Sequence, residues 1–145
     1  MIFAIVLPQP PKSQQAKRKV AYQVHLKSKA SAKYANPPVH DTNLYMRIIW
    51  FTRNKGGPDV DNIVKPIFDA LEGVVYMNDL QLVQILSTRI NLGESYMISN
   101  TNILPSLYSE LENTINKGYN HILYIEIGRM TGQQAVFGPI DGGAQ

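Results

Sequence analysis

The stretch GPDVDNIVKPIFDALEGVVYMNDLQL, residues 57–82, holds five of the chain's 11 acidic residues, and four of these five are aspartates. Asp59 and Asp61 are separated by one residue, so on an extended chain both carboxylates would face the same side. Lys65 follows Asp61 by about one turn if a helix begins there. Asp79 comes after the expected helix. Carboxylates that converge with a lysine are what a hard divalent cation and a phosphodiester both need.

Pro66 limits the helix in this stretch. Proline is tolerated only in the first helical turn, and it biases the preceding residue, Lys65, away from the α region. We therefore expect an irregular or 3₁₀ segment at 61–65 and a regular helix over 66–72 that stops at Gly73. The position of Lys65 then no longer follows from helical spacing alone.

Two segments, PDVDNIVKPIFDAL and GVVYMNDLQLVQI, resemble the RusA-like Holliday junction resolvases, which are small phage- and prophage-type endodeoxyribonucleases. The family pattern reads D-x-D-N-x-x-K, then D-A-L, then a glycine and D-D-x-Q-V. The matching residues are Asp59, Asp61, Asn62, Lys65, Asp69, Ala70, Leu71, Gly73, Asp79 and Gln81. Asn78 stands where many members carry the first aspartate of the pair. This chain therefore has one carboxylate fewer, so the sequence does not determine whether the site binds one metal ion or two.

The resemblance implies that Asp59, Asp61, Lys65 and Asp79 are the catalytic residues. The three aspartates would bind Mg²⁺, with Mn²⁺ able to substitute, and the metal would activate a water and neutralise phosphate charge. Lys65 would stabilise charge on the scissile phosphate or orient the water. Without the resemblance, the residues are compatible with two interpretations: a metal site and an ordinary acidic surface.

Two neighbouring residues have less defined roles. Asn62 could cap the helix or hold a metal-bound water. Asp69 lies inside the expected helix, where it could support the metal site or simply pair with Lys65 as a structural acid.

The resemblance further implies an activity. It predicts a magnesium-dependent, structure-selective endonuclease that resolves four-way DNA junctions by paired symmetric nicks during recombination and repair. Two nicks in two strands need two active sites, so a homodimer is expected. Two alternatives remain: a nuclease that acts mainly on other branched phage DNA, and a branched-DNA-binding protein that does not cleave. Only Asn78 favours the second alternative.

Charge is distributed unevenly along the chain. Up to Lys55 there are ten lysines and arginines against one acid, Asp41, and beyond Lys55 four basic residues face ten acids. A basic half beside grouped aspartates favours a polyanion that is held by one part and cut by the other, although a solvated basic surface is the alternative. The residues predicted to contact DNA phosphates are Lys12, Lys17, Arg18, Lys19, Lys27, Lys29, Arg53 and Lys55.

Composition sets further bounds. A chain of 145 residues is expected to form one domain with a real core. No cysteine is present, which excludes disulfides, thiolate-bound zinc and a cysteine nucleophile. No apolar run is long enough for a membrane span, and the start lacks a basic region, so we expect no signal peptide and a cytoplasmic protein. The three histidines, His25, His40 and His121, lack metal-ligand spacing.

Apolar patterning predicts an α+β fold with a single two-layer domain. Strands are expected at 2–7, 44–52, 82–92 and 121–127, with a short extended piece at 74–78. Helices are expected at 13–33, capped by Ser13 with a buried stripe of Ala16, Val20 and Val24, at 66–72, and from Pro105 onward. We expect a mixed sheet of four to five strands with helices mainly on one face. The endonuclease domain should span 1–128, followed by a flexible tail at 129–145.

Overall fold

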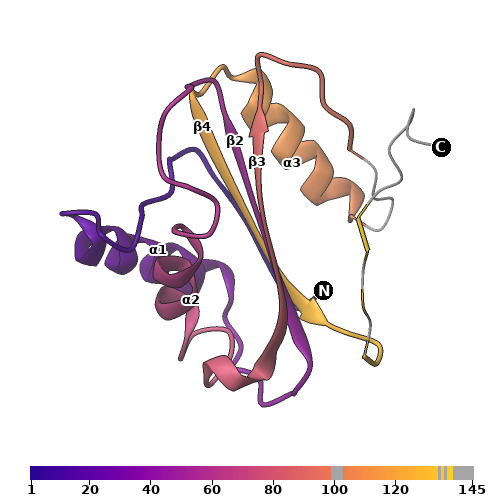
Figure 1. Ribbon diagram of the computed structural model, residues 1–145. Coiled ribbons are helices and arrows are strands. Elements are labelled where there is room, and N and C mark those ends of the chain that lie inside the picture. Colours follow the sequence, from indigo (N-terminus) through magenta and orange to yellow (C-terminus); the bar gives the residue numbers. More distant parts are fainter. Residues whose placement is uncertain (99–102, 134, 136, 139–145) are drawn as a thin grey trace.

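The computed structural model describes residues 1–98, 103–133, 135 and 137–138. The elements of this part are, in order, β1 (Phe3–Leu7), α1 (Lys19–Lys33), β2 (Leu44–Thr52), α2 (Val64–Leu71), the 3₁₀ helix η1 (Asp79–Gln81), β3 (Leu82–Asn91), α3 (Pro105–Asn116) and β4 (His121–Arg129). The strands form one mixed sheet in the order β1-β4-β2-β3 (Figure 1). β4 is antiparallel to both β1 and β2, whereas β2 and β3 are parallel. The crossover that a parallel pair requires contains α2.

The two faces of the sheet are covered by different numbers of helices. α1 and α2 pack together on one face, and α3 lies on the other (Figure 1). The larger core, on the α1–α2 side, includes Leu26, Ile48, Trp50, Ile67 and Ile125. The smaller core, under α3, includes Val6, Phe51, Leu107, Leu111 and Ile122. The predicted α+β domain with a mixed sheet and helices mainly on one face is confirmed, with α3 as the helix on the second face.

The central strand β2 has the bounds predicted from its aromatic and branched residues. Successive side chains alternate between the two faces. Trp50 enters the larger core at 1% exposure, and Phe51 enters the smaller core at 3% exposure. β2 therefore joins both cores, because it is buried on both sides.

α1 begins at Lys19, later than the predicted start at Ser13. Arg18 precedes the helix and makes no side-chain capping bond, so the predicted Ser13 cap is wrong. The segment before the helix forms turns, and the backbone N–H of Gln14 donates to the carbonyl of Asn62 at 3.1 Å. The two residues are far apart in the sequence, so local helix preference does not predict this contact between the segment before α1 and the loop before α2.

The predicted buried stripe of α1 is also wrong. It consisted of Ala16, Val20 and Val24. Val20 and Val24 are 70% and 64% exposed, whereas Tyr22, Leu26 and Ala30 are buried. Both sets recur every fourth residue, so spacing cannot choose between them. The second set places a tyrosine and a leucine against the core, which removes more apolar area from water.

α2 confirms only part of the argument from proline. Pro66 lies in the first turn of the helix, and residues 60–63 form an irregular lead-in of turns. The helix begins at Val64, however, two residues before the predicted start, so Lys65 is helical and the predicted irregular segment at 61–65 is wrong at its end. The helix ends at Leu71, one residue earlier than predicted. Gly73 follows with a φ of 82°, a conformation that glycine adopts readily.

The extended piece predicted at 74–78 is not a strand. Turns follow α2, and Tyr76 forms only isolated bridges with Val39 and Glu72. The Tyr76 side chain is fully buried, and its hydroxyl donates to the carbonyl of Phe68. This piece therefore packs back onto α2, and η1 follows it.

At the end of the chain, β4 extends to Arg129, one residue past the predicted domain limit. Much of the predicted tail, namely residues 134, 136 and 139–145, lies outside the described residues. In the part of the chain that the structure describes, no helix is long and apolar enough to cross a bilayer.

Candidate active site

The loop between β2 and α2 carries Asp59 and Asp61, and β3 holds this loop in place. The Arg89 guanidinium donates to the carbonyls of Asn54 at 2.8 Å and Gly56 at 3.0 Å. It also lies over the Trp50 ring, with its central carbon 4.6 Å from the ring centroid. This arrangement is a cation–π contact that fixes both the guanidinium and the loop.

Gly57 lets the loop lie against Trp50. Its φ is 116°, and a Cβ atom there would lie 2.5 Å from Cη2 of Trp50. Only glycine satisfies both conditions, the positive φ and the close approach. Pro58 and Asp59 therefore follow a loop segment whose position is fixed by Trp50 and Arg89.

The segment from Asp59 to Asn62 is a turn and not an extended chain. The Asn62 N–H donates to the Asp59 carbonyl at 3.0 Å, and the Val64 N–H reaches the Asp61 carbonyl at 3.4 Å. Ser87 Oγ on β3 donates to the Val60 carbonyl at 2.6 Å. The argument that alternate residues of an extended chain share a side therefore does not apply to these two aspartates.

Neither Asp61 nor Asn62 caps α2. The residue preceding the helix is Ile63, and no side-chain capping bond is made there. The simplest structural explanation for an aspartate or asparagine at this place, a helix cap, is therefore absent.

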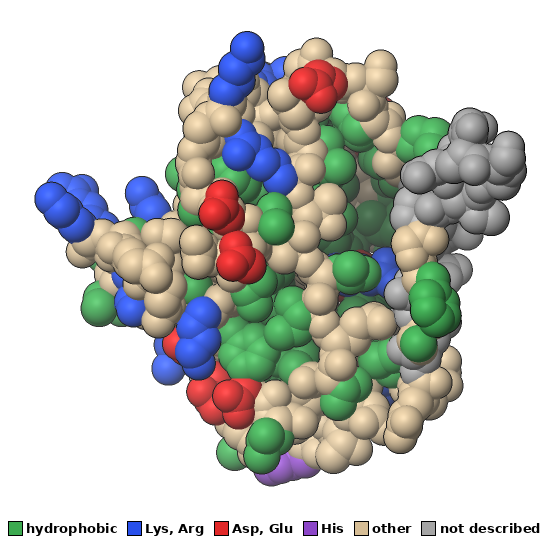
Figure 2. All heavy atoms as spheres, in the orientation of Figure 1, with side chains coloured by type: hydrophobic (Ala, Val, Ile, Leu, Met, Phe, Trp, Pro, Cys, Tyr) green, Lys and Arg blue, Asp and Glu red, His purple; other side chains and the backbone are tan. Residues whose placement is uncertain are grey.

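The three aspartates predicted to bind metal, Asp59, Asp61 and Asp79, are exposed. Among the described residues, the ion pairs involve Lys65 with Asp69 and Arg129 with Asp41, and no hydrogen bond reaches the side-chain oxygens of these three. Figure 2 shows acidic and basic side chains close together on the face that carries this loop and α2. Exposed, unpaired carboxylates keep all their oxygens available to a cation.

Lys65 pairs with Asp69 one turn along α2, with 2.9 Å between Nζ and Oδ1. The hydrogen bond to Asp69 and its charge raise the pKa of Lys65, and Asp79 and Glu72 add to the rise. Asp79 on η1 therefore lies within the electrostatic reach of Lys65 on α2. The pairing between Lys65 and Asp69, one of the two roles considered for Asp69, is present.

η1 positions Asp79 through its two neighbours. Asn78 caps the 3₁₀ helix, and its Oδ1 accepts from the Leu80 N–H at 3.0 Å. Gln81 is 6% exposed, and its Oε1 accepts from the N–H groups of Met77 and Asn78 at 2.7 and 2.9 Å. Asparagine and aspartate cap equally well, so Asn78 keeps this geometry although it lacks the carboxylate.

Gln81 also ties η1 to the chain before β2. Its Nε2 donates to the carbonyls of Val39 at 2.9 Å and Asp41 at 2.7 Å. Sequence reasoning identified Gln81 only as a matching position of the pattern. Its buried role could not be read from the sequence, because both acceptors lie about 40 residues away.

The donor chemistry of the three aspartates fits Mg²⁺. Mg²⁺ takes one or two carboxylates and completes its shell with waters and phosphate oxygens. Asp59, Asp61 and Asp79 supply such carboxylates. Within the described residues, no group of three or more histidines and acids is close enough to hold a metal. The structure therefore does not bring these three aspartates into one three-carboxylate cluster.

The predicted DNA-contacting residues differ in their surroundings. Lys17, Arg18, Lys27, Lys29 and Lys55 are exposed, and Lys19 is partly buried. Arg53 donates to the carbonyls of Ile115 and Tyr119, both at 3.2 Å, so its guanidinium binds the C-terminal end of α3.

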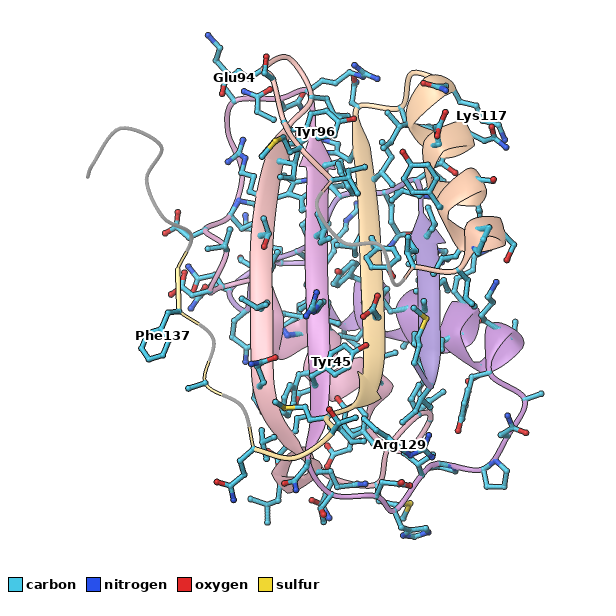
Figure 3. The ribbon with its side chains drawn as sticks, turned by 90° about the vertical axis from the view of Figure 1, so that its right-hand side faces the viewer. Tyr45, Glu94, Tyr96, Lys117, Arg129 and Phe137 are labelled. Carbon is cyan, nitrogen blue, oxygen red and sulfur yellow. The ribbon has the colours of Figure 1, made fainter. Side chains whose placement is uncertain are left out.

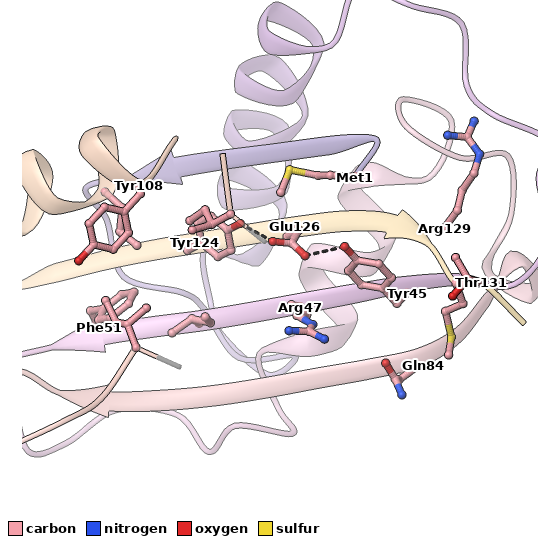
Figure 4. Close-up of a pocket in the computed structure, with 15 residues that line it drawn as sticks. Met1, Tyr45, Arg47, Phe51, Gln84, Tyr108, Tyr124, Glu126, Arg129 and Thr131 are labelled. Atoms are coloured by element: carbon pink, nitrogen blue, oxygen red, sulfur yellow. Dashed lines mark hydrogen bonds between the residues drawn. The ribbon is translucent and has the colours of Figure 1, made fainter. Parts of the chain in front are cut away.

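A separate cavity of about 420 Å³ lies on the opposite face of the sheet (Figures 3 and 4). At its centre Glu126 accepts hydrogen bonds from the hydroxyls of Tyr45 and Tyr124. No residue predicted for the catalytic site or the DNA interface lines this cavity.

A small α+β domain with exposed aspartates, which have no side-chain partner among the described residues, and with exposed basic residues has features expected of a nuclease. Comparison with protein families supports this class: residues 6–97 match the family of the endodeoxyribonuclease RusA. The match covers more than half of the chain and includes Asp59, Asp61, Lys65 and Asp79. The chain belongs to the RusA endodeoxyribonuclease family, as the resemblance predicted. A comparison with curated proteins found no match.

Proposed function

We propose that this protein is a magnesium-dependent, structure-selective endodeoxyribonuclease that resolves four-way DNA junctions by paired symmetric nicks during recombination and repair. Members of its family are endonucleases that bind branched DNA and generally depend on a divalent metal. The observation that carries the proposal is the set of three exposed aspartates, in the loop before α2 and on η1, whose side chains have no hydrogen-bond or ion-pair partner among the described residues.

Asp59, Asp61 and Asp79 are proposed to hold the metal. Mg²⁺, or Mn²⁺ in its place, would neutralise phosphate charge and lower the pKa of a bound water. The fixed loop and the capped 3₁₀ helix present the carboxylates, and no donor in the described part of the chain competes for their oxygens.

Lys65 is proposed to stabilise charge on the scissile phosphate. Its ammonium has three N–H donors, and the ion pair with Asp69 uses one of them. The raised pKa keeps Lys65 protonated at physiological pH, so it acts as an electrostatic group and not as a base. Asp69 would orient Lys65, and Asn62 would hold a metal-bound water.

The basic residues before and on α1 are proposed to hold DNA phosphates. Junction affinity should fall steeply with salt, because each contact releases a counterion. Replacing Lys17, Arg18 and Lys19 with glutamine should reduce the slope of log affinity against log salt by up to about 3. Fluorescence anisotropy at several salt concentrations measures this slope. If the variant keeps the wild-type slope, this cluster does not touch DNA.

Paired nicking is proposed to require a homodimer in the cytoplasm. Light scattering at micromolar concentration should give about twice the 16.3 kDa of the single chain. A strict monomer, both free and on junction DNA, would contradict the paired-nick mechanism.

The direct test compares labelled four-way, three-way and linear DNA, each with and without Mg²⁺. The proposal expects metal-dependent nicks at symmetric positions of the four-way junction. Faster cleavage of the three-way substrate would favour a nuclease for other branched phage DNA. Tight junction binding without cleavage would favour the non-cleaving alternative, for which Asn78 is the one supporting residue.

A further inference from the structure

A cavity of about 510 Å³ opens directly beside the proposed catalytic loop. Its walls are the segment before α1 and the loop after β2, and His121 of β4 contributes to it. The lining residues are Pro10, Pro11, Lys12, Ser13, Ala16, Trp50, Asn54, Gly56, Gly57, Pro58 and His121. The volume falls within the range of pockets that hold small ligands. Pro58, which lines the cavity, immediately precedes Asp59, so the cavity adjoins the loop that carries the proposed metal ligands.

Hydrogen bonds hold this side of the cavity in place without a ligand. Arg89 fixes the carbonyls of Asn54 and Gly56, and the Asn54 N–H donates to Thr52 Oγ1 at 3.0 Å. Gly57 rests against the Trp50 ring. The cavity is therefore a preformed feature of the loop and the sheet.

The hydrogen bonds of His121 determine how Asn54 is presented. Trp50 Nε1, which can only donate, lies 3.1 Å from His121 Nδ1, so Nδ1 must accept and carries no proton. The proton of the neutral ring therefore sits on Nε2. Burial lowers the pKa of His121, and the charges of Arg89 and Lys12 lower it further, in agreement with a neutral ring.

Asn54 must then turn its carbonyl oxygen toward His121. The structure places Asn54 Nδ2 3.1 Å from His121 Nε2. Two donors cannot bond each other, so the amide nitrogen and oxygen, which have nearly the same size, exchange places and Oδ1 accepts from Nε2. The amide NH₂ group of Asn54 faces away from the histidine. This leaves two N–H donors, held in a defined orientation, at a residue that lines the cavity.

The lining has the chemistry of a nucleotide site. Among the described residues that line it, Lys12 is charged, His121 is neutral, and none is acidic. A lysine suits a phosphate, the Asn54 amide suits the acceptors on a base edge, and the prolines offer apolar surface.

We propose that this cavity binds the nucleotide next to the scissile phosphate, with Lys12 on its phosphate and the Asn54 amide on its base. The cavity then determines which base is preferred beside the cut. This inference rests on the proposed nuclease function. It names the part of the substrate that the cavity would bind.

The first test measures base preference with four-way junctions whose nucleotides on both sides of the nick are varied. Wild type should prefer particular bases at one of these positions, and Asn54→Ala should reduce the preference at least about tenfold. Asn113→Ala, which alters an exposed asparagine of α3, is the matched control and should retain it. An unchanged preference in Asn54→Ala, or no preference in wild type, would overturn the inference.

The second test does not require cleavage. Trp50 is the chain's single tryptophan and lines the cavity, so its fluorescence reports ligand entry. Junction DNA without metal should change the emission of wild type and of Asn113→Ala. Gly56→Leu should show a much smaller change, because Gly56 lines the cavity and an added side chain there narrows it, while a Cβ at Gly56 meets nothing within 4 Å.

The two tests separate failure of the cavity from failure of the function. If wild type binds junctions but never nicks them, the nuclease function fails, while the Trp50 signal still decides whether the cavity takes a nucleotide. If wild type nicks normally but DNA leaves Trp50 emission unchanged, the cavity proposal is wrong and the nuclease function stands. Thermal unfolding of Gly56→Leu should match wild type.

Discussion

Acidic side chains on the two faces of the sheet differ in their exposure and in their hydrogen bonds. On the side of α1 and α2, Asp59 and Asp61 are exposed and accept no hydrogen bond from the side chain of any residue that the structure describes. On the opposite face, Glu126 is partly buried, and the hydroxyls of Tyr45 and Tyr124 both donate to it (Figure 4). Burial and the hydrogen bond to Glu126 raise the pKa of Tyr45 to about 12.

The contrast separates acids that stabilise the fold from acids that are available to a ligand. A carboxylate that leaves water must regain hydrogen bonds, and Glu126 does so through two tyrosines. Exposed carboxylates keep their hydration and need no protein partner, so Asp59, Asp61 and Asp79 remain free for a cation. An aspartate on the first face should therefore matter for cleavage, and Glu126 should matter for stability.

The largest expected effect is that of Asp61→Asn. Asparagine keeps the shape but removes the anionic ligand, so Mg²⁺-dependent nicking should fall by orders of magnitude. Junction binding without metal should stay the same or tighten, because negative charge beside the phosphate is lost. Nicking assays and metal-free anisotropy measure the two effects.

Asp61 does not cap α2, so the unfolding temperature of Asp61→Asn should match that of wild type. A folded variant that nicks junctions at close to the wild-type rate would end the catalytic interpretation of this loop.

Lys65→Ala should have the next largest effect. Losing one preorganised donor to the scissile phosphate should slow nicking by about 10²–10³-fold. Junction affinity should remain within a few-fold, since many other basic residues contact DNA. Single-turnover kinetics separate the two quantities, and an unchanged cleavage rate would remove Lys65 from the mechanism.

Glu126→Gln should lower the stability of the fold and leave cleavage unchanged, in contrast to the two preceding variants. The amide keeps one acceptor oxygen for the two tyrosine hydroxyls, so the free energy of unfolding should fall by about 1–2 kcal/mol. The nicking rate should not change. Urea unfolding measures the loss, with Tyr45→Phe as the control that removes one of the two bonds. Loss of cleavage in a folded Glu126→Gln protein would show that the two faces are not independent.

The smallest effect concerns pH and His121. Because its pKa is lowered in the folded protein, the unfolded chain binds a proton below about pH 6.5 that the folded chain does not. The free energy of unfolding should therefore fall as pH decreases below this value, until the lowered folded pKa is reached. Urea unfolding between pH 7 and 5 measures the trend, and His121→Gln should flatten it. Equal pH dependence in both proteins would assign the loss to other groups.

Local rules predicted those parts of the fold that depend on neighbouring residues. The bounds of β2, the start of α3 at Pro105 and the place of Pro66 in the first turn of α2 all follow from patterning and proline geometry. The motif in residues 57–82 identified the family and named the candidate site residues. These features lie within short stretches of chain, so the sequence determined them by itself.

The tertiary structure decided everything that joins distant residues. It chose Tyr22 and Leu26 over Val20 and Val24 as the buried face of α1, although both pairs have the same spacing. Arg89 holds the loop of Asp59, and Gln81 anchors η1, through bonds that span about 35 and 40 residues. Such contacts depend on how the elements pack, and a local pattern carries no information about a partner that far away.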